Sequence, residues 1–267
     1  MDQILSEGWI SSIEWLSEID STNAYLKRRI LGEQLEKLPQ LVVSDQQTAG
    51  RGRGQNAWWS PEGCLMFSIA WQPDQPSQHV DHCIRGKLSQ LPLVIGVSIA
   101  KALNRFLSDK KPVKVKWPND VYVNGKKLGG ILIESIFSGS RQFWVIGAGV
   151  NLLVKLDSAS EPIRSNATSL DLECRSHERE FLNLETILVA IVHEIQKTLE
   201  YWQLQEGYLD TVWPEYCILT DRWIEIQQDQ RRIEGKCVGI DDRGALLIQE
   251  PSGNCQSVLS GVVLAWS

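Results

Sequence analysis

Hydrophobic residues recur at helical spacing in three stretches of the chain. Residues 21–38 carry leucine or isoleucine every three to five positions, and Ser21 or Thr22 can cap the first turn. Residues 91–107 and 182–204 show similar spacing. We therefore predict a helix over each of these ranges.

Short apolar runs bounded by turn residues predict strands between these helices. Before the third helix, these runs cover 41–44, 64–71, 113–117, 120–123, 128–137 and 143–153. Asn124-Gly125 is a strong hairpin dipeptide and joins two of them. Residues 154–181 are polar and predict a loop with short structure. The pattern indicates a largely antiparallel sheet with helices between some strands.

The pattern changes after about Thr220. Four short alternating segments follow, separated by turns rich in Asp, Gly and Ser, and they cover 223–226, 233–240, 245–249 and 258–264. Several short strands at this spacing indicate a small barrel. We therefore predict a main domain over 1–219 and a small C-terminal domain over 220–267.

Composition narrows the functional class. The chain has 267 residues, 43% of them hydrophobic and 22% charged, which is ordinary for a soluble globular protein. Its net charge of −6 gives no bulk attraction for nucleic acid phosphates. No apolar run approaches the roughly 18 residues that span a membrane. The N-terminus does not read as a secretory signal, and the six cysteines lack CxxC spacing. These features predict a cytoplasmic protein with reduced thiols.

The most unusual segment is a glycine- and arginine-rich loop, Gln47-Thr48-Ala49-Gly50-Arg51-Gly52-Arg53-Gly54. Alternating Gly and Arg combine a mobile backbone with guanidinium groups, and such a loop can close over a polyanion. The alternative is a solvated turn or an RGG-like nucleic acid segment. The residues alone leave both interpretations open, although the position between two buried strands argues against a free tail.

Two further segments contain charged residues that can contact the same polyanion. Lys116-Trp117-Pro118-Asn119-Asp120 ends a strand in a proline turn, and a carboxylate there can hold Mg²⁺ near phosphates. In Lys126-Lys127-Leu128-Gly129-Gly130, one lysine can neutralise an α-phosphate, and alternation favours Lys127. Glycines on a strand let a ligand lie against the backbone. The alternatives are an ordinary turn and a solvated hairpin tip.

Other chemistries find little support. Gly147-Ala148-Gly149-Val150-Asn151 lacks the third glycine and the helix of a dinucleotide fingerprint. The sequence contains no GxxxxGK[ST], GxSxG or HExxH pattern. His79, His82 and Cys83 are close together, but no second ligand pair follows them. We therefore expect neither a P-loop, a serine hydrolase nor a structural metal site.

Read together, these segments resemble the biotin–protein ligases, also called biotin–[acetyl-CoA-carboxylase] ligases. The resemblance covers nearly the whole chain and includes Ser21-Thr22-Asn23, 47–53, Trp58 with Ser60-Pro61, 116–120, 127–130, 147–151, 239–241, Gly244 and 260–261. It implies an α+β fold: a mixed, largely antiparallel sheet flanked by helices, followed by an SH3-like barrel.

The resemblance also implies an activity and partners. The family forms biotinyl-5'-AMP from biotin and ATP and then transfers biotin to a lysine of a biotin carboxyl carrier protein. Many relatives carry an N-terminal DNA-binding winged helix. This chain begins too close to Ser21 to hold one, so we expect no DNA partner. Because no apolar run is long enough to span a membrane, we also expect no membrane partner. Mg²⁺ is expected with ATP, and the oligomeric state, a homodimer included, is left open.

Roles for individual residues follow from the resemblance. The biotin pocket would comprise Ser21, Thr22, Asn23, Gln47, Gly50, Arg51, Gly52, Arg53, Lys127 and Gly130. ATP would be bound by Arg51, Arg53, Trp58, Asn119, Asp120, Lys127 and Asn151. Lys127, Arg51, Arg53 and Asp120 would be catalytic, with Asp120 serving Mg²⁺.

One departure from the family concerns the Gly-Arg loop. Relatives often continue with a second basic pair, whereas Gly54-Gln55-Asn56-Ala57 follows Arg53 here. We expect a weaker grip on phosphates or on the adenylate. Two alternative functions remain: a lipoate or octanoate transferase of related fold, and a non-enzymatic protein that binds anions or nucleic acid.

Overall fold

The computed structural model describes residues 1–6, 8–35, 37–72, 88–107, 111–175, 179 and 182–267. His79, His82 and Cys83 lie outside the described residues. In the part that is described, no helix is both long and apolar enough to cross a membrane.

A seven-stranded sheet forms the centre of the molecule. In spatial order its strands are β1 (Ser12–Ile19), β2 (Gln40–Gln47), β3 (Cys64–Trp71), β7 (Arg141–Asn151), β6 (Lys126–Ser138), β5 (Asp120–Val123) and β4 (Lys114–Lys116). β1 and β2 pair in parallel, and the other neighbours are antiparallel. The mixed, largely antiparallel sheet is therefore confirmed.

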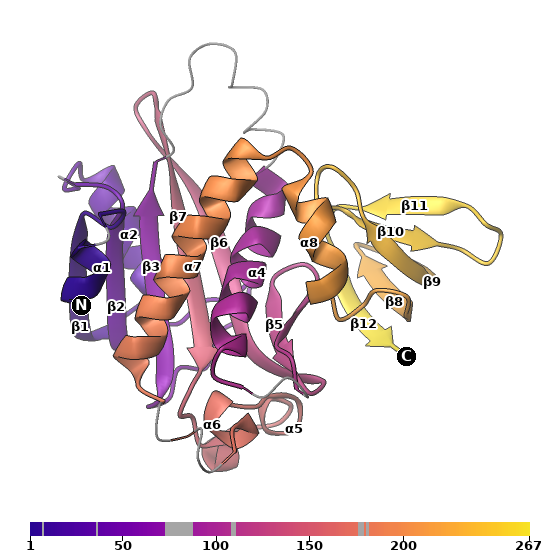
Figure 1. The fold of residues 1–267 in the computed structure, drawn as a ribbon, viewed down its shortest axis with the longest axis horizontal. Coiled ribbons are helices and arrows are strands. Elements are labelled where there is room, and N and C mark those ends of the chain that lie inside the picture. Colours follow the sequence, from indigo (N-terminus) through magenta and orange to yellow (C-terminus); the bar gives the residue numbers. More distant parts are fainter. Residues whose placement is uncertain (7, 36, 73–87, 108–110, 176–178, 180–181) are drawn as a thin grey trace.

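Two long helices cover one face of this sheet (Figure 1). α4 (Leu91–Asn104) is apolar on nearly all sides because it lies between the sheet and α7 (Leu184–Leu204). α1 (Asp2–Ser6) contacts α7, and α8 (Tyr208–Tyr216) packs against α4. The main hydrophobic core lies between these helices and the sheet.

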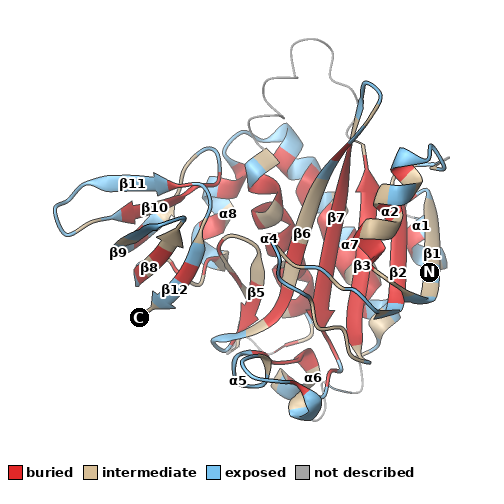
Figure 2. Cartoon of the chain, turned by 180° about the vertical axis from the view of Figure 1, so that it is seen from behind, coloured by how far each residue is buried: buried red, intermediate tan, exposed pale blue. Residues whose placement is uncertain are grey.

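The opposite face is only partly covered. α2 (Thr22–Leu31) packs on β3, β6 and β7 over a second, smaller core. The odd-numbered residues of β3 from Leu65 to Trp71 point to the main core, so the even-numbered ones lie on this second face. In Figure 2 the loop after β2 crosses the part of this face that α2 leaves uncovered.

The C-terminal segment forms a separate antiparallel sheet. Its spatial order is β11 (Cys255–Val258), β10 (Leu246–Gln249), β9 (Arg231–Ile240), β8 (Trp223–Gln228) and β12 (Val262–Trp266). It is fixed to the main sheet near β4, because the indole Nε1 of Trp117 donates to the carbonyl of Gly244 at 3.1 Å. The N–H of Ile218 also donates to the carbonyl of Val115 at 2.9 Å.

Several elements differ from the prediction. The helix predicted over 21–38 ends at Leu31, because Gly32 follows and Glu33 adopts a φ of 53°. The strand predicted over 258–264 is two strands, β11 and β12, with a turn between them. Residues 154–181 contain η2 (Leu156–Ser158), α5 (Ile163–Asn166) and α6 (Leu170–Glu173); η1 (Leu88–Gln90) precedes α4. α1 and α8 were not predicted.

Candidate active site

The register of the main sheet builds a floor for a cleft. One row of directly paired residues runs from β3 to β4 through Met66, Gly149, Gly130, Asp120 and Lys116. All of these lie on the face that α4 and α7 do not cover. The two glycines lower the middle of the floor, and the charged side chains stand at its β4 end.

A cleft of about 700 Å³ lies over this floor. Its walls come from α2, the loop after β2, strands β4 to β7, the segment before α5, and β12. The sequence-predicted residues that line it are Ser21, Thr22, Asn23, Gln47, Arg51, Gly52, Arg53, Trp58, Asn119, Asp120, Lys127 and Gly130. The structure thus brings together residues that lie far apart in the sequence.

One end of the cleft is a network of uncharged polar side chains. Ser68 on β3 is fully buried, and its Oγ lies 2.7 Å from Thr22 Oγ1 and 2.6 Å from Asn23 Oδ1. Gln47 Oε1 accepts from the N–H of Thr22 at 2.8 Å. Gln47 Nε2 donates to Ser60 Oγ at 3.4 Å. Buried polar groups held in this way form a rigid donor and acceptor surface.

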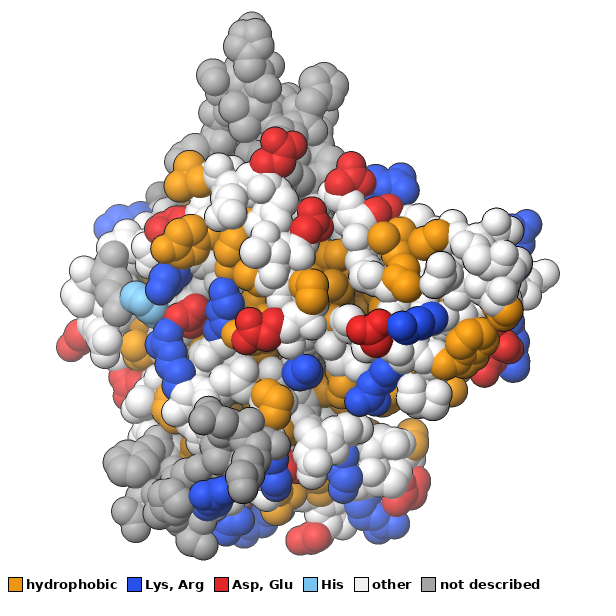
Figure 3. All heavy atoms as spheres, turned by 45° about the vertical axis from the view of Figure 1, so that its right-hand side comes forward, with side chains coloured by type: hydrophobic (Ala, Val, Ile, Leu, Met, Phe, Trp, Pro, Cys, Tyr) orange, Lys and Arg blue, Asp and Glu red, His pale blue; other side chains and the backbone are white. Residues whose placement is uncertain are grey.

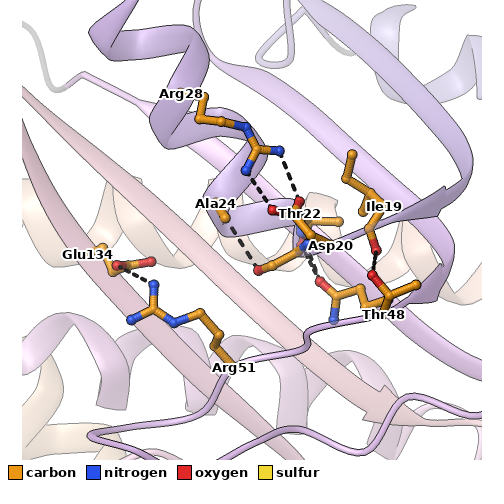
Figure 4. Close-up of polar contacts among 10 residues, drawn as sticks. Ile19, Asp20, Thr22, Ala24, Arg28, Thr48, Arg51 and Glu134 are labelled. Atoms are coloured by element: carbon orange, nitrogen blue, oxygen red, sulfur yellow. Dashed lines mark hydrogen bonds and ion pairs between the residues drawn. The ribbon is translucent and has the colours of Figure 1, made fainter.

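The start of α2 places two of these side chains. Ser21 is the N-cap, and its Oγ accepts from the N–H of Ala24 at 3.5 Å. Figure 4 shows Asp20, just before the helix, paired with Arg28 about two turns along it, at 2.6 Å and 2.9 Å. Hydrogen bonding from Arg28 lowers the pKa of Asp20. The cap and the ion pair hold the first turns of α2 in place, and Thr22 and Asn23 in the first turn face the sheet.

The Gly-Arg loop is a small hairpin that lies across the floor. Trp58 N–H donates to the carbonyl of Gly50, and Gly52 N–H donates to that of Asn56. Two arginines tie the hairpin to the sheet. Arg51 Nη1 lies 3.6 Å from Glu134 Oε1, and Arg53 Nη1 donates to Asn119 Oδ1 at 3.2 Å. Gly50 is confined, since a Cβ there would meet Trp58 O at 2.6 Å.

Side chains of the chain itself lie against the strand glycines. A Cβ at Gly147 would meet Asn23 Oδ1 at 2.1 Å, and one at Gly149 would meet the Trp58 ring at 2.5 Å. A Cβ at Gly130 would meet the same ring at 3.3 Å. These glycines therefore admit Asn23 and Trp58, whereas the sequence suggested direct approach of a ligand.

The charged end of the cleft pairs a lysine with a carboxylate. Lys127 Nζ lies 2.6 Å from Asp120 Oδ1 and 5.7 Å from the centre of the Trp58 ring. Lys127 is half-buried and Lys126 is exposed, as strand alternation predicted. Burial lowers the pKa of Lys116 to about 8, against the favourable effect of Asp120. Lys116 was not among the predicted site residues.

Asn151 lies in a different place from the other predicted residues. It lines a smaller pocket of about 220 Å³, which shares Trp58 and Lys127 with the main cleft and also contains Trp59 and Tyr122. Its Nδ2 donates to the carbonyl of Thr168 at 3.0 Å. Asn119 thus lines the main cleft and Asn151 the smaller pocket, and Trp58 lines both.

The family model for the Biotin/lipoate A/B protein ligase family matches residues 15–151 of this 267-residue chain. The chain belongs to this family. A second model, for the biotin protein ligase C terminal domain, matches residues 222–266, which contain all of β8 to β12.

Curated members of the family are similar to this chain over most of its length. The bifunctional ligase/repressor BirA of Escherichia coli is 34% identical, and the match covers 93% of this chain and 72% of that protein. The biotin–[acetyl-CoA-carboxylase] ligase of Paracoccus denitrificans is 30% identical over 89% of this chain and 94% of that protein.

A solved family structure has the same fold. The biotin protein ligase from Aquifex aeolicus, in complex with biotin and ATP, is 28% identical with a TM-score of 0.76. The superposition covers 97% of this chain and 99% of that chain. The predicted fold class and family are thus confirmed.

Two residues that shape the cleft were not predicted from the sequence. Ser68 orders the polar end of the cleft, and Glu134 contacts both Asn23 and Arg51. Ser68 interrupts the apolar strand Cys64–Trp71, and Glu134 with its neighbour Ser135 interrupts the apolar run Leu128–Phe137. That interruption was the available signal, because a buried polar side chain needs a partner.

Proposed function

We propose that this chain is an ATP-dependent biotin–protein ligase that makes biotinyl-5'-AMP and pyrophosphate and then biotinylates a lysine. The observation that carries the proposal is the cleft, which joins a rigid polar end to a cluster of cations. Biotin has the same division, with a polar ureido ring at one end and a carboxylate at the other. The names of the similar ligases support the same activity.

The polar end of the cleft would hold the ureido ring. Thr22, Asn23 and Gln47 supply hydroxyl and amide groups there, and Ser21 begins the same helix turn. Their orientations are fixed by hydrogen bonds to each other and to Ser68 before any ligand arrives. Such preorganisation favours binding, because less side-chain freedom is lost on association.

The cations would bring two anions together. The biotin carboxylate attacks the α-phosphorus of ATP, the bond to the β-phosphate oxygen breaks, and pyrophosphate leaves. Lys127, Arg51 and Arg53 line the cleft where this charge is concentrated. To act, Lys127 would exchange its contact with Asp120 for the ligand carboxylate. Gly50 and Gly52 shape the hairpin that would cover the mixed anhydride and exclude water.

The smaller pocket would take the adenine ring. Trp58, Trp59 and Tyr122 give it aromatic walls, and Asn151 lies at its edge. Trp58 separates this pocket from the main cleft, so it would cover the nucleotide while its other face contacts the floor glycines. Asn119 would stay with Arg53 on the side of the phosphates.

Mg²⁺ fits this site as a companion of ATP. Mg²⁺ in such sites is held by one or two carboxylates together with substrate phosphates. Asp120 is a carboxylate at the phosphate end, and the described residues contain no group of three metal-binding side chains. Asp120 would hold the ion, which when bound neutralises phosphate charge.

In the second reaction the acceptor amine attacks the acyl carbon, the acyl–oxygen bond breaks, and AMP leaves. The amine proton passes to solvent, and holding amine and anhydride together supplies much of the acceleration. The acceptor would be a biotin carboxyl carrier protein. Its lysine would enter beside β12, where Gly261, Val262 and Val263 form one lip of the cleft.

The alternatives fit the structure less well. A lipoate or octanoate transferase needs an aliphatic tunnel, whereas the closed end here presents hydroxyls and amides. A protein that binds nucleic acid needs a stripe or patch of clustered lysine and arginine side chains. Figure 3 shows basic and acidic side chains interspersed on the face that it presents, and the chain carries a net charge of −6.

The test is adenylate formation by purified protein with Mg²⁺–ATP and biotin, with lipoate and octanoate in parallel. We expect biotinyl-AMP and pyrophosphate with biotin alone. Lys127→Ala should lower single-turnover adenylation by about 100-fold or more, since electrostatic groups of this kind contribute ~3 kcal/mol. Lys126→Ala is the matched control on the same hairpin and should retain activity. Unchanged adenylation by Lys127→Ala would remove Lys127 from the mechanism.

A further inference from the structure

Glu134 lies on the cleft face of β6 and contacts two different elements with its two oxygens. Oε2 accepts from Asn23 Nδ2 of α2 at 3.0 Å, and Oε1 faces Arg51 Nη1 of the loop at 3.6 Å. Its side chain is 19% exposed, so water only partly screens these contacts. Figure 4 shows Arg51 reaching from the loop to Glu134 across the strand.

The first contact sets the orientation of Asn23. The amide nitrogen of Asn23 donates to Glu134 and to the carbonyl of Leu132 at 3.2 Å. Its oxygen accepts from Ser68 at 2.6 Å. A carboxylate and a backbone carbonyl can only accept a hydrogen bond, so Glu134 and the carbonyl of Leu132 together fix which end of the amide faces the sheet. The orientation of a residue in the polar end of the cleft thus depends on Glu134.

The second contact holds the Gly-Arg loop. Within the hairpin, backbone bonds join the loop to itself, as in the pairs Gly52–Asn56 and Trp58–Gly50. Its attachment to β6 is made by the side chain of Arg51. An ion pair in which the arginine is 49% exposed contributes little stability, so it can open and close readily.

We propose that Glu134 is a positioning residue that couples the acid-binding end of the cleft to the Gly-Arg loop. One carboxylate orients Asn23 and holds Arg51, so the polar wall and the cover over the reaction centre share one anchor. This proposal rests on the proposed function for its kinetic consequences. It also predicts a property of the loop that needs no substrate.

Glu134→Gln separates the two contacts, because the glutamine carbonyl can still accept from Asn23 while its charge for Arg51 is lost. We expect the KM for biotin to stay within about 2-fold. Escape of biotinyl-AMP from the enzyme should rise up to about 5-fold, the equivalent of ~1 kcal/mol for an exposed ion pair. Glu134→Ala loses both contacts and should also raise the KM for biotin about 10-fold or more.

A test of the loop without substrate uses trypsin, which cleaves after arginine. In native protein, Glu134→Gln should speed cleavage after Arg51 and Arg53, since the loop loses one of the two arginine contacts that hold it. Glu225→Gln is the matched control, because it removes the same charge from an ion pair with Arg232 at 2.8 Å in the C-terminal sheet. The rate of cleavage after Arg51 and Arg53 in this control should equal that of the wild type.

The two readouts separate the two proposals. If the wild type makes no adenylate but Glu134→Gln speeds loop cleavage, the ligase function fails and the anchor stands. Equal cleavage rates, or adenylate escape that Glu134→Gln leaves unchanged, would overturn the anchor whatever the activity. In an Arg51→Ala background Glu134→Gln should not further speed cleavage after Arg53; a further increase would also overturn the anchor.

Discussion

At the scale of single residues, the glycines of β7 are explained by the side chains that contact them. Gly147 is contacted by Asn23, whose amide is held by Ser68 and Glu134. Gly149 is contacted by Trp58. The absence of a Cβ therefore allows both the polar wall and the aromatic partition to sit against the sheet.

Gly147→Ala should damage biotin recognition without unfolding the protein. The new Cβ would lie 2.1 Å from Asn23 Oδ1, so Asn23 must move and lose its bonds to Ser68 and Glu134. Each lost buried hydrogen bond costs ~1–3 kcal/mol, so we expect the KM for biotin to rise at least about 10-fold.

The control for this substitution is Gly139→Ala in the turn between β6 and β7. Gly139 has a φ of 60° and nothing within 4 Å of the added Cβ. It should lose about 1 kcal/mol of folding stability with an unchanged KM for biotin. Steady-state kinetics with urea unfolding of both variants separates the two effects, and equal KM values would contradict this account of Gly147.

Most of the site residues predicted from the sequence line the cleft, because their motifs carry unusual combinations of Gly, Arg, Asn and Asp. Their roles in binding and catalysis stay predictions. Ser68 and Glu134 were missed because their importance lies in partners more than 40 positions away, such as Asn23. Asn119 and Asn151 were both predicted to bind ATP, and they line two pockets that share Trp58.

At the scale of elements, the cap of α7 is a local source of stability. The side chain of Asn183 accepts from the N–H groups of Glu185 and Thr186 at 2.9 Å and 3.2 Å. Asn183→Ala should lower the free energy of unfolding by about 1 kcal/mol. Urea denaturation measures this, with Gln196→Ala on the same helix as a control that stays within about 0.5 kcal/mol.

Helices and strands were predictable where the pattern of apolar and turn-forming residues was clear. β3 and β5 have the predicted bounds, because each is an apolar run between turn residues. The helix over 21–38 was predicted too long, since Leu35 and Leu38 contact the smaller core from an irregular segment. The strand over 258–264 was wrong because the turn at Ser260-Gly261 breaks it.

At the scale of the whole molecule, Lys116 joins the two sheets. Its Nζ donates to the carbonyl of Val263 on β12 at 3.3 Å and lies 4.1 Å from the centre of the Trp266 ring. Burial lowers its pKa from 10.5 to about 8 in the folded protein. At pH values between about 8 and 10.5, Lys116 is therefore protonated in the unfolded chain and neutral in the folded chain.

This contribution should therefore make the free energy of unfolding rise with pH between about 8 and 10.5. Lys116→Met removes the titrating group, so its unfolding free energy should gain less over this window than that of the wild type. Urea denaturation across the window tests this. Lys126→Met, at an exposed position, should keep the wild-type pH dependence.

The fold class was predictable from the order of helices and strands along the chain, because both occur before Thr220 and only strands follow. The boundary between residues 219 and 220 and a cytoplasmic location stay predictions. The way the C-terminal sheet meets the cleft was not predictable. It depends on contacts such as Trp117 with Gly244, which no local pattern encodes.

The walls of the cleft extend along the chain from Ser21 to Val263. During synthesis the polar end, the glycine floor and the lysine hairpin emerge early, whereas the lip beside them belongs to β12, which follows the other described strands in the sequence. Contacts between such distant segments form late in folding. A nascent chain therefore lacks this lip of the cleft until β12 has left the ribosome.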